Sequence, residues 1–125
     1  MYEYNAKCIK VVDGDTADFL VDLGFDTWKK VRVRFAGINT PETRTRDKEE
    51  KEKGLKAKAR VQEIMDMNEN KVMLNVHGIG KFGRALADIL VESVGTVADR
   101  SMTLTNVNQL LIKEGHGKEY SGGAR

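Results

Sequence analysis

Alternating apolar and polar residues predict three strands in the first third of the chain. Residues 16–23 show this pattern most clearly, with apolar side chains on one face and aspartates on the other. Residues 2–12 and 28–35 carry related patterns, and short runs rich in glycine and aspartate separate the three segments. We therefore expect a meander of three neighbouring strands.

A helical period replaces the alternation in the middle of the chain. Apolar residues recur there every three to four positions, which predicts an amphipathic helix that ends near residues 68–70. Its predicted inner face consists of Gly54, Ala57, Val61, Ile64, Met65 and Asn68.

Residues 44–53, before this helix, form a dense run of mixed charge without apolar periodicity. We expect a solvated, flexible loop there. The alternative is a loop that also touches a polyanion through Arg44, Arg46 or Lys48.

Two more strands, 70–76 and 84–91, are predicted on either side of a glycine-rich turn at 78–83. Residues 92–103 are polar and contain glycine, which favours a loop. A short helix follows, because Val107, Leu110 and Leu111 share one helical face.

The ends of this second helix also have local signals. Asn106 is a suitable N-cap, and Gly115 is a suitable stop just beyond the last turn. Residues 117–125 contain a Gly-Gly pair and are expected to form a flexible tail. The order of three strands, a helix, two strands and a helix is typical of the OB-fold, a five-stranded Greek-key barrel. We expect residues 1–125 to form one such α+β domain, which suits a chain of this length.

The composition agrees with a soluble globular domain. Hydrophobic residues make up 40% and charged residues 32%. The net charge of +2 does not indicate a histone-like polycation, but it leaves open a local basic patch that is balanced by acids elsewhere. The single cysteine, Cys8, cannot form an internal disulfide, and it is expected to be a small buried side chain. One cysteine and two scattered histidines also exclude a zinc cluster.

Neither a signal-peptide core nor a run of about 20 apolar residues is present. We therefore expect a cytoplasmic or otherwise intracellular protein without a membrane partner, a form that would suit a phage-encoded enzyme. A monomer is expected, since no heptad repeat or long apolar patch is visible.

The candidate chemistry is concentrated in the charged turn from Arg34 to Glu42. Pro41, the only proline, fixes its own backbone angle and disfavours helix at Thr40, so the chain must turn sharply. The turn carries a guanidinium, the oxygen atoms of Asn39 and Thr40, and a carboxylate. Such a group of charges suits a metal ion and a phosphate.

Four short pieces, taken together and in this order, resemble the active site of the staphylococcal nuclease (thermonuclease) family. They are Asp13-Gly14-Asp15-Thr16, Arg34, Asn39-Thr40-Pro41-Glu42 and Lys81-Phe82-Gly83-Arg84. The resemblance covers roughly residues 8–117. It implies a calcium-dependent nuclease that cleaves DNA, RNA or both at the 5′ oxygen and leaves 3′-phosphate ends.

The same resemblance implies roles for individual residues. Asp15, Asn39 and the carbonyl of Thr40 would hold calcium, with Asp13 as a supporting acid. Glu42 would act on the attacking water. The remaining implied roles are catalytic contacts to the phosphate from Arg34 and Arg84, and substrate binding by Lys81, Phe82 and Tyr120.

Some positions depart from the family pattern. Asn39 stands where a carboxylate is usual, so we expect weaker calcium binding. Phe82 replaces a tyrosine, which keeps the stacking face and loses the hydroxyl. His77 and His116 match no catalytic position and are expected to be structural or exposed.

Three functions are therefore open. The first is the nuclease, with mainly single-stranded DNA or RNA as its partner. The second is a non-catalytic OB-fold that binds single-stranded nucleic acid, and the third is an interaction domain whose charged turn pairs internally. The presence of Glu42 favours the nuclease, because a carboxylate beside a phosphate would only repel the ligand of a binding module.

Overall fold

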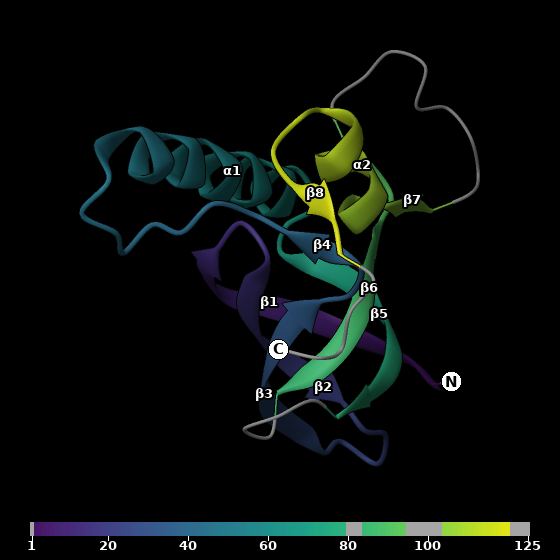
Figure 1. Cartoon of the computed structure of the whole chain (residues 1–125). Coiled ribbons are helices and arrows are strands. Elements are labelled where there is room, and N and C mark those ends of the chain that lie inside the picture. The colour runs from purple at the N-terminus through teal and green to yellow at the C-terminus, as the bar shows by residue number, and fades with distance from the viewer. Residues whose placement is uncertain (1, 80–83, 95–103, 121–125) are drawn as a thin grey trace.

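The computed structural model describes residues 2–79, 84–94 and 104–120. Within these residues, five long strands close into a barrel, and both helices lie at the same end of it (Figure 1). The strands follow the antiparallel order β3-β2-β1-β5-β6, and β3 pairs with β6 in parallel to close the barrel. These strands are β1 (Tyr2–Asp13), β2 (Thr16–Asp22), β3 (Trp28–Phe35), β5 (Lys71–Ile79) and β6 (Ala85–Val91). The predicted five-stranded OB-fold with two helices is confirmed.

Three two-residue strands were not predicted, because they are too short to leave a pattern. They are β4 (Ile38–Asn39), β7 (Thr105–Asn106) and β8 (Lys118–Glu119). β8 pairs with β4, so the expectation of a flexible tail over residues 117–125 is wrong at Lys118 and Glu119. The N–H of Tyr120 continues this connection by donating to the carbonyl of Gly37 at 2.9 Å. Residues 121–125 of the expected tail lie outside the described residues.

The alternating apolar positions of the strands fill the barrel. Phe19, Val33 and Phe35 are at most 1% exposed, and Leu74 and Ile89 meet them from the opposite strands. Burial of each such side chain contributes roughly 1.5–3 kcal/mol relative to exposure. Cys8 is also buried, as expected, and burial raises the pKa of its thiol to about 11. At neutral pH this thiol is therefore protonated and unreactive.

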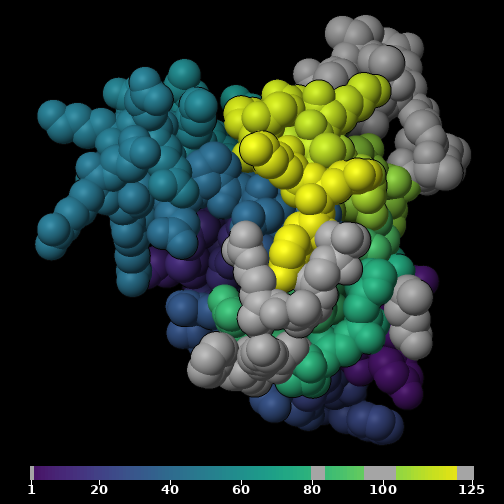
Figure 2. Space-filling view, viewed as in Figure 1, coloured from purple at the N-terminus to yellow at the C-terminus, as the bar shows by residue number. Residues whose placement is uncertain are grey.

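Helix α1 (Lys48–Met67) begins earlier than the apolar spacing predicted. Asp47 caps it, since one carboxylate oxygen accepts from the N–H groups of Glu49 and Glu50 at 3.0 and 3.3 Å. The expectation of a loop across 44–53 is therefore wrong from Lys48 onward, because lysine and glutamate favour helix even without an apolar face. The residues near the start of α1 project away from the barrel (Figure 2). No helix among the described residues is long and apolar enough to cross a membrane.

Two glycines allow α1 to approach the turns at the end of the barrel. A Cβ at Gly54 would lie 2.6 Å from the carbonyl oxygen of Glu42 and 2.7 Å from that of Pro41. A Cβ at Gly14, in the β1–β2 turn, would lie 2.6 Å from the Cβ of Ala57. The helix therefore packs directly against both turns that carry predicted site residues.

Helix α2 (Val107–Lys113) has the predicted ends. The Asn106 side chain accepts from the N–H of Gln109 at 3.3 Å, and Gly115 has a φ of +83° just beyond the helix. These observations confirm both end signals.

Asn108 is fully buried on the inner face of α2 and connects the helix to the barrel. Its amide nitrogen donates to the carbonyls of Ala36 and Ala87 at 2.8 and 3.1 Å, and its oxygen accepts from the N–H of Ile89 at 3.2 Å. All its hydrogen-bonding atoms are thus used, so it fixes the residue that follows β3 against β6. Sequence reasoning missed Asn108, although an amide between the apolar residues of a short helix was a visible signal.

Arg60 joins α1 to the end of α2. Its guanidinium donates to both carboxylate oxygens of Glu114, at 2.8 and 2.9 Å, and to the carbonyl of Val94 at 3.0 Å. The hydrogen bond from Arg60 holds the pKa of Glu114 below its ordinary value. This pair therefore stabilises the fold only while Glu114 is ionised.

We predict that Gly54→Ala destabilises the protein. The added methyl group would overlap the Pro41 and Glu42 carbonyls, and such overpacking costs about 1–3 kcal/mol, against a gain of about 1 kcal/mol in helix propensity. Urea denaturation measures the free energy of unfolding. Gly78→Ala is the control, because a Cβ there would have no described atom within 4 Å beyond its chain neighbours. Equal stability of the two variants would contradict close contact between α1 and the turn.

We predict that Arg60→Met lowers stability at neutral pH, and that its difference from wild type shrinks in acid. The folded-state pKa of Glu114 is depressed, so its contribution is present above the ordinary glutamate pKa of about 4.3 and disappears as pH falls through the folded-state value. Urea denaturation at neutral pH and at about pH 3 tests this, with Arg46→Met as the control. A difference that stays constant with pH would show that the ion pair contributes nothing.

Candidate active site

Asp15 lies just before β2, and its side chain is the centre of the predicted site. The residue is 8% exposed. One carboxylate oxygen accepts from the N–H of Thr40 at 3.0 Å, and the other accepts from the hydroxyl of Thr16 at the same distance. Its carbonyl accepts from the N–H of Phe35 at 2.8 Å. These bonds join the β1–β2 turn to the segment that follows β3.

The guanidinium of Arg34, on β3, contacts oxygen atoms of the segment that follows this strand. Its Nη1 donates to the carbonyls of Ile38 and Phe35 at 2.8 and 3.1 Å and lies 3.4 Å from Oδ2 of Asp15. Its Nη2 lies 3.5 Å from the amide oxygen of Asn39. The guanidinium is mostly buried and brings a carboxylate and an amide oxygen to one place. Arg34 therefore already pairs with groups of the protein itself.

Glu42 follows this cluster and is exposed to solvent. Its N–H lies 3.5 Å from a carboxylate oxygen of Glu50 on α1. The next residue, Thr43, donates its hydroxyl to the carboxylate of Asp13 at the end of β1. The turn is therefore attached on one side to α1 and on the other to the barrel, which leaves the Glu42 carboxylate at the surface.

Arg84, directly before β6, lines a hollow of about 480 Å³ beside the cluster. Its guanidinium has no hydrogen-bond or ion-pair partner among residues 2–79, 84–94 and 104–120. Asp13 and Thr16 line the same hollow, and Thr16 also donates to Asp15. The structure therefore brings Asp13 and Arg84 together next to the group formed by Asp15, Arg34, Asn39 and Thr40. The residues lining the hollow are Val12, Asp13, Thr16, Arg32, Arg44 and Arg84.

Tyr120 reaches the site from the other end of the chain. The β4–β8 pairing carries it beside β3, and its ring centroid lies 5.9 Å from Cζ of Arg34. A guanidinium at this distance interacts favourably with the ring face. Lys81 and Phe82, the other two predicted substrate-binding residues, lie outside the described residues.

The oxygen atoms near Arg34 suit calcium in kind, since a carboxylate, an amide oxygen and backbone carbonyls are all hard ligands. Asp15 supplies a carboxylate, but Arg34 already neutralises it in part. No group of three or more acidic, histidine or cysteine side chains suited to a metal is present in the described part of the chain. The hydroxyl of Thr40 is buried against Gly14 and has no hydrogen-bond partner in the described part of the chain, and the carbonyl of Thr40 remains the candidate ligand. The candidate ligands therefore fit calcium in kind, but together they carry little negative charge.

Sequence reasoning missed the role of Asp18, which it placed on the solvent side of its strand. The residue is only 4% exposed because Arg32 covers it, donating from Nε and Nη2 at 2.8 and 3.2 Å. The hydrogen bond from Arg32 lowers the pKa of Asp18. The available signal was the pairing of an acid and an arginine on adjacent antiparallel strands.

Each of the two histidines lies beside an acid that is not a predicted site residue. His77 is 2.9 Å from Asp88 between β5 and β6, and His116 is 3.9 Å from Glu114.

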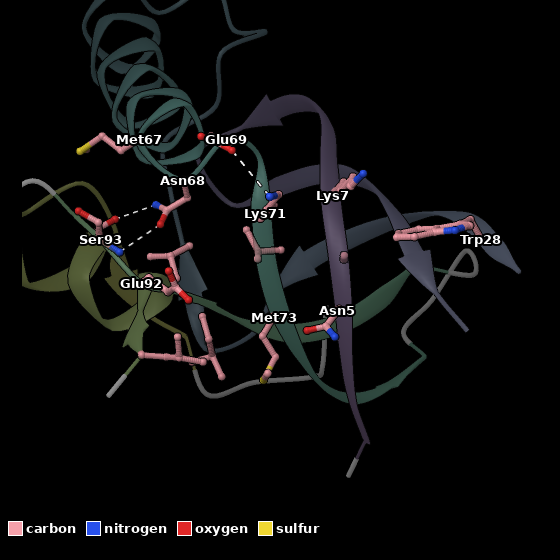
Figure 3. A pocket seen from close by; sticks show the side chains of 15 residues that line it. Asn5, Lys7, Trp28, Met67, Asn68, Glu69, Lys71, Met73, Glu92 and Ser93 are labelled. Carbon is pink, nitrogen blue, oxygen red and sulfur yellow. Dashed lines mark hydrogen bonds and ion pairs between the residues drawn. The ribbon is translucent and has the colours of Figure 1, made fainter. Parts of the chain in front are cut away.

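A separate groove crosses β1, β5 and the end of α1, and its lining includes Lys7, Trp28 and Met67 (Figure 3). It contains none of the predicted site residues.

The chain matches a known protein family. No curated protein matches the sequence. The family described as "Staphylococcal nuclease homologue" matches residues 32–123, which span most of the chain. That range contains Arg34, the Asn39–Glu42 turn and Arg84. The chain therefore belongs to the staphylococcal nuclease homologue family, a family of nuclease and nucleic-acid-binding domains.

Proposed function

We propose that this protein is a calcium-dependent nuclease that hydrolyses DNA, RNA or both, mainly as single strands. It would break the bond to the 5′ oxygen and leave 3′-phosphate ends. The observation that carries the proposal is the convergence of Asp15, Asn39 and Arg34 at the base of the Glu42 turn, beside Arg84, which has no hydrogen-bond or ion-pair partner among the described residues.

The two arginines are suited to holding the phosphate. A phosphodiester carries negative charge on its non-bridging oxygens, and that charge moves toward the leaving oxygen as the bond breaks. Arg34 and Arg84 can each offer paired N–H donors to such oxygens. Arg34 would use donors that do not already bond to backbone carbonyls, while Arg84 has no competing partner among the described residues.

Glu42 is suited to removing the proton of the attacking water. Its carboxylate is exposed, and its backbone is held between α1 and Asp13 through its neighbour Thr43. In the reaction, the water oxygen would bond to phosphorus while the bond to the 5′ oxygen breaks. Glu42 would take one proton from the water, and the leaving oxygen would receive one from solvent.

Asp15, Asn39 and the Thr40 carbonyl would hold calcium. When bound, calcium would supply positive charge at the phosphate and order water near it. The Asp15–Arg34 contact of 3.4 Å means that Asp15 is oriented before any cation arrives.

One observation favours the alternative, a binding module without catalysis. The described part of the chain has no cluster of three acidic side chains, and Arg34 partly neutralises Asp15. Such a module would bind single strands through arginines and the Tyr120 ring. It would bind without hydrolysis, so a single assay series separates the two functions.

We predict that calcium supports hydrolysis of single-stranded DNA and that a chelator abolishes it. Glu42→Gln should lower the rate by about 10²–10⁴-fold, because it removes the base, and Arg34→Ala by about 10²–10³-fold. Glu52→Gln is the matched control, since Glu52 is exposed on α1. Binding of the DNA without hydrolysis by the wild type would favour the binding module. Hydrolysis that survives both Glu42→Gln and chelator would contradict the site.

We predict that Asn39→Asp strengthens calcium binding by about tenfold, because ligand charge tunes calcium affinity. The new carboxylate would also attract Arg34, now 3.5 Å from the Asn39 oxygen, and this attraction works against the gain. The rise in melting temperature on adding calcium measures binding without any activity. Asn5→Asp adds the same charge on the exposed face of β1 and is the control. An equal response of the two variants would remove Asn39 from the calcium site.

A further inference from the structure

Three arginines lie close together on the outer face of the barrel. Arg32 and Arg34 are two residues apart on β3, so their side chains leave the same face at roughly 7 Å spacing. Arg84 directly precedes Ala85, which pairs with Val33 in the parallel β3–β6 ladder. The same register, extended by one residue, places Arg84 level with Arg32. Both arginines line the hollow beside the Asp15–Arg34 cluster.

Asp18 holds the Arg32 guanidinium in a fixed orientation. The two N–H···O bonds, at 2.8 and 3.2 Å, use Nε and one hydrogen of Nη2. A guanidinium has five N–H donors, so three of them remain directed away from the acid. Because Asp18 is 4% exposed and both its carboxylate oxygens accept hydrogen bonds from Arg32, this carboxylate is not free to turn toward another donor. Arg32 is therefore preorganised to meet a further acceptor.

Arg44 brings a third guanidinium to the hollow from the loop after Glu42. The Thr43 hydroxyl bonds to Asp13 and thereby anchors this loop at the rim. Like Arg84, Arg44 has no hydrogen-bond or ion-pair partner in the described part of the chain.

The charges of the hollow favour an anion. Three guanidinium groups face two carboxylates, Asp13 and Asp18, which leaves one net positive charge. Neighbouring guanidinium groups repel each other, so an anion between them lowers the electrostatic energy. The forked donors of arginine match the paired oxygens of a phosphate.

We propose that Arg32, Arg44 and Arg84 form a second phosphate subsite, which takes the phosphate next to the one cleaved in a DNA or RNA strand. This proposal rests on the proposed nuclease function, because it assigns the scissile phosphate to Arg34. Arg84 lines the hollow and would contact both phosphates. The substrate is therefore a chain with at least two phosphates, and a single diester is a poor one.

Arg44→Gln is the informative variant, because removal of Arg32 would leave the buried Asp18 carboxylate unpaired. Arg46→Gln is the matched control, since Arg46 is an exposed arginine two positions away that does not line the hollow. The first measurement compares kcat/KM for a trinucleotide with two phosphates and for a dinucleoside monophosphate. We expect Arg44→Gln to lower the preference for the longer substrate about tenfold, as loss of one charged hydrogen bond would do. Arg46→Gln should retain the wild-type preference.

The second measurement needs no catalysis. Binding of a single-stranded oligothymidylate is followed by fluorescence anisotropy in chelator at several salt concentrations. Loss of one phosphate contact should reduce the slope of log K against log salt by about 0.7 in Arg44→Gln and leave it unchanged in Arg46→Gln. Arg44→Lys should restore the slope, because the charge returns, but only part of the substrate preference.

The outcomes separate this proposal from the one on which it rests. Equal preference and equal slope in Arg44→Gln and Arg46→Gln would overturn the second subsite, even in an active nuclease. If the wild type hydrolyses neither substrate with calcium, and Arg44→Gln alone reduces the slope, then the subsite stands and the nuclease function fails.

Discussion

The buried carboxylate of Asp15 is the constraint on which the site depends. A carboxylate at 8% exposure must find donors inside the protein, and it finds them in the Thr40 N–H, the Thr16 hydroxyl and the nearby Arg34. Two of these partners belong to β3 and the turn after it. The β1–β2 turn therefore cannot move without the charged turn, and the oxygen atoms of the site keep one arrangement.

The remaining contacts hold the charged turn from its other sides. Gly54 lets α1 lie against the Pro41 and Glu42 carbonyls, while Asn108 bonds the residue after β3 to β6. Arg60 then ties α1 to the end of α2. Each helix thus supports a loop of the barrel end, which is where binding residues of a rigid scaffold usually lie.

The elements that could be predicted from the sequence are those set by residues close together along the chain. Alternation revealed the barrel strands, the helical spacing revealed the inner face of α1, and Asn106 and Gly115 marked the ends of α2. The start of α1 at Lys48 was missed because its charged residues favour helix without periodicity. The partners of Asp18 and Asn108 are distant in sequence, so the acid in a strand and the amide in an apolar helix were visible while the groups that bond to them were not. The same holds for the two-residue strands β4 and β8.

The β4–β8 pairing has a consequence for how the protein is made. The ribosome synthesises the chain from the N-terminus, so Asp15, Arg34 and Arg84 emerge before α2 and β8. Until those later residues appear, Ala36 lacks its bond to Asn108, Gly37 lacks its bond to Tyr120, and Arg34 lacks the ring beside it. In a nascent chain the charged residues therefore lack these contacts, and the site reaches its final structure only when synthesis has passed Tyr120.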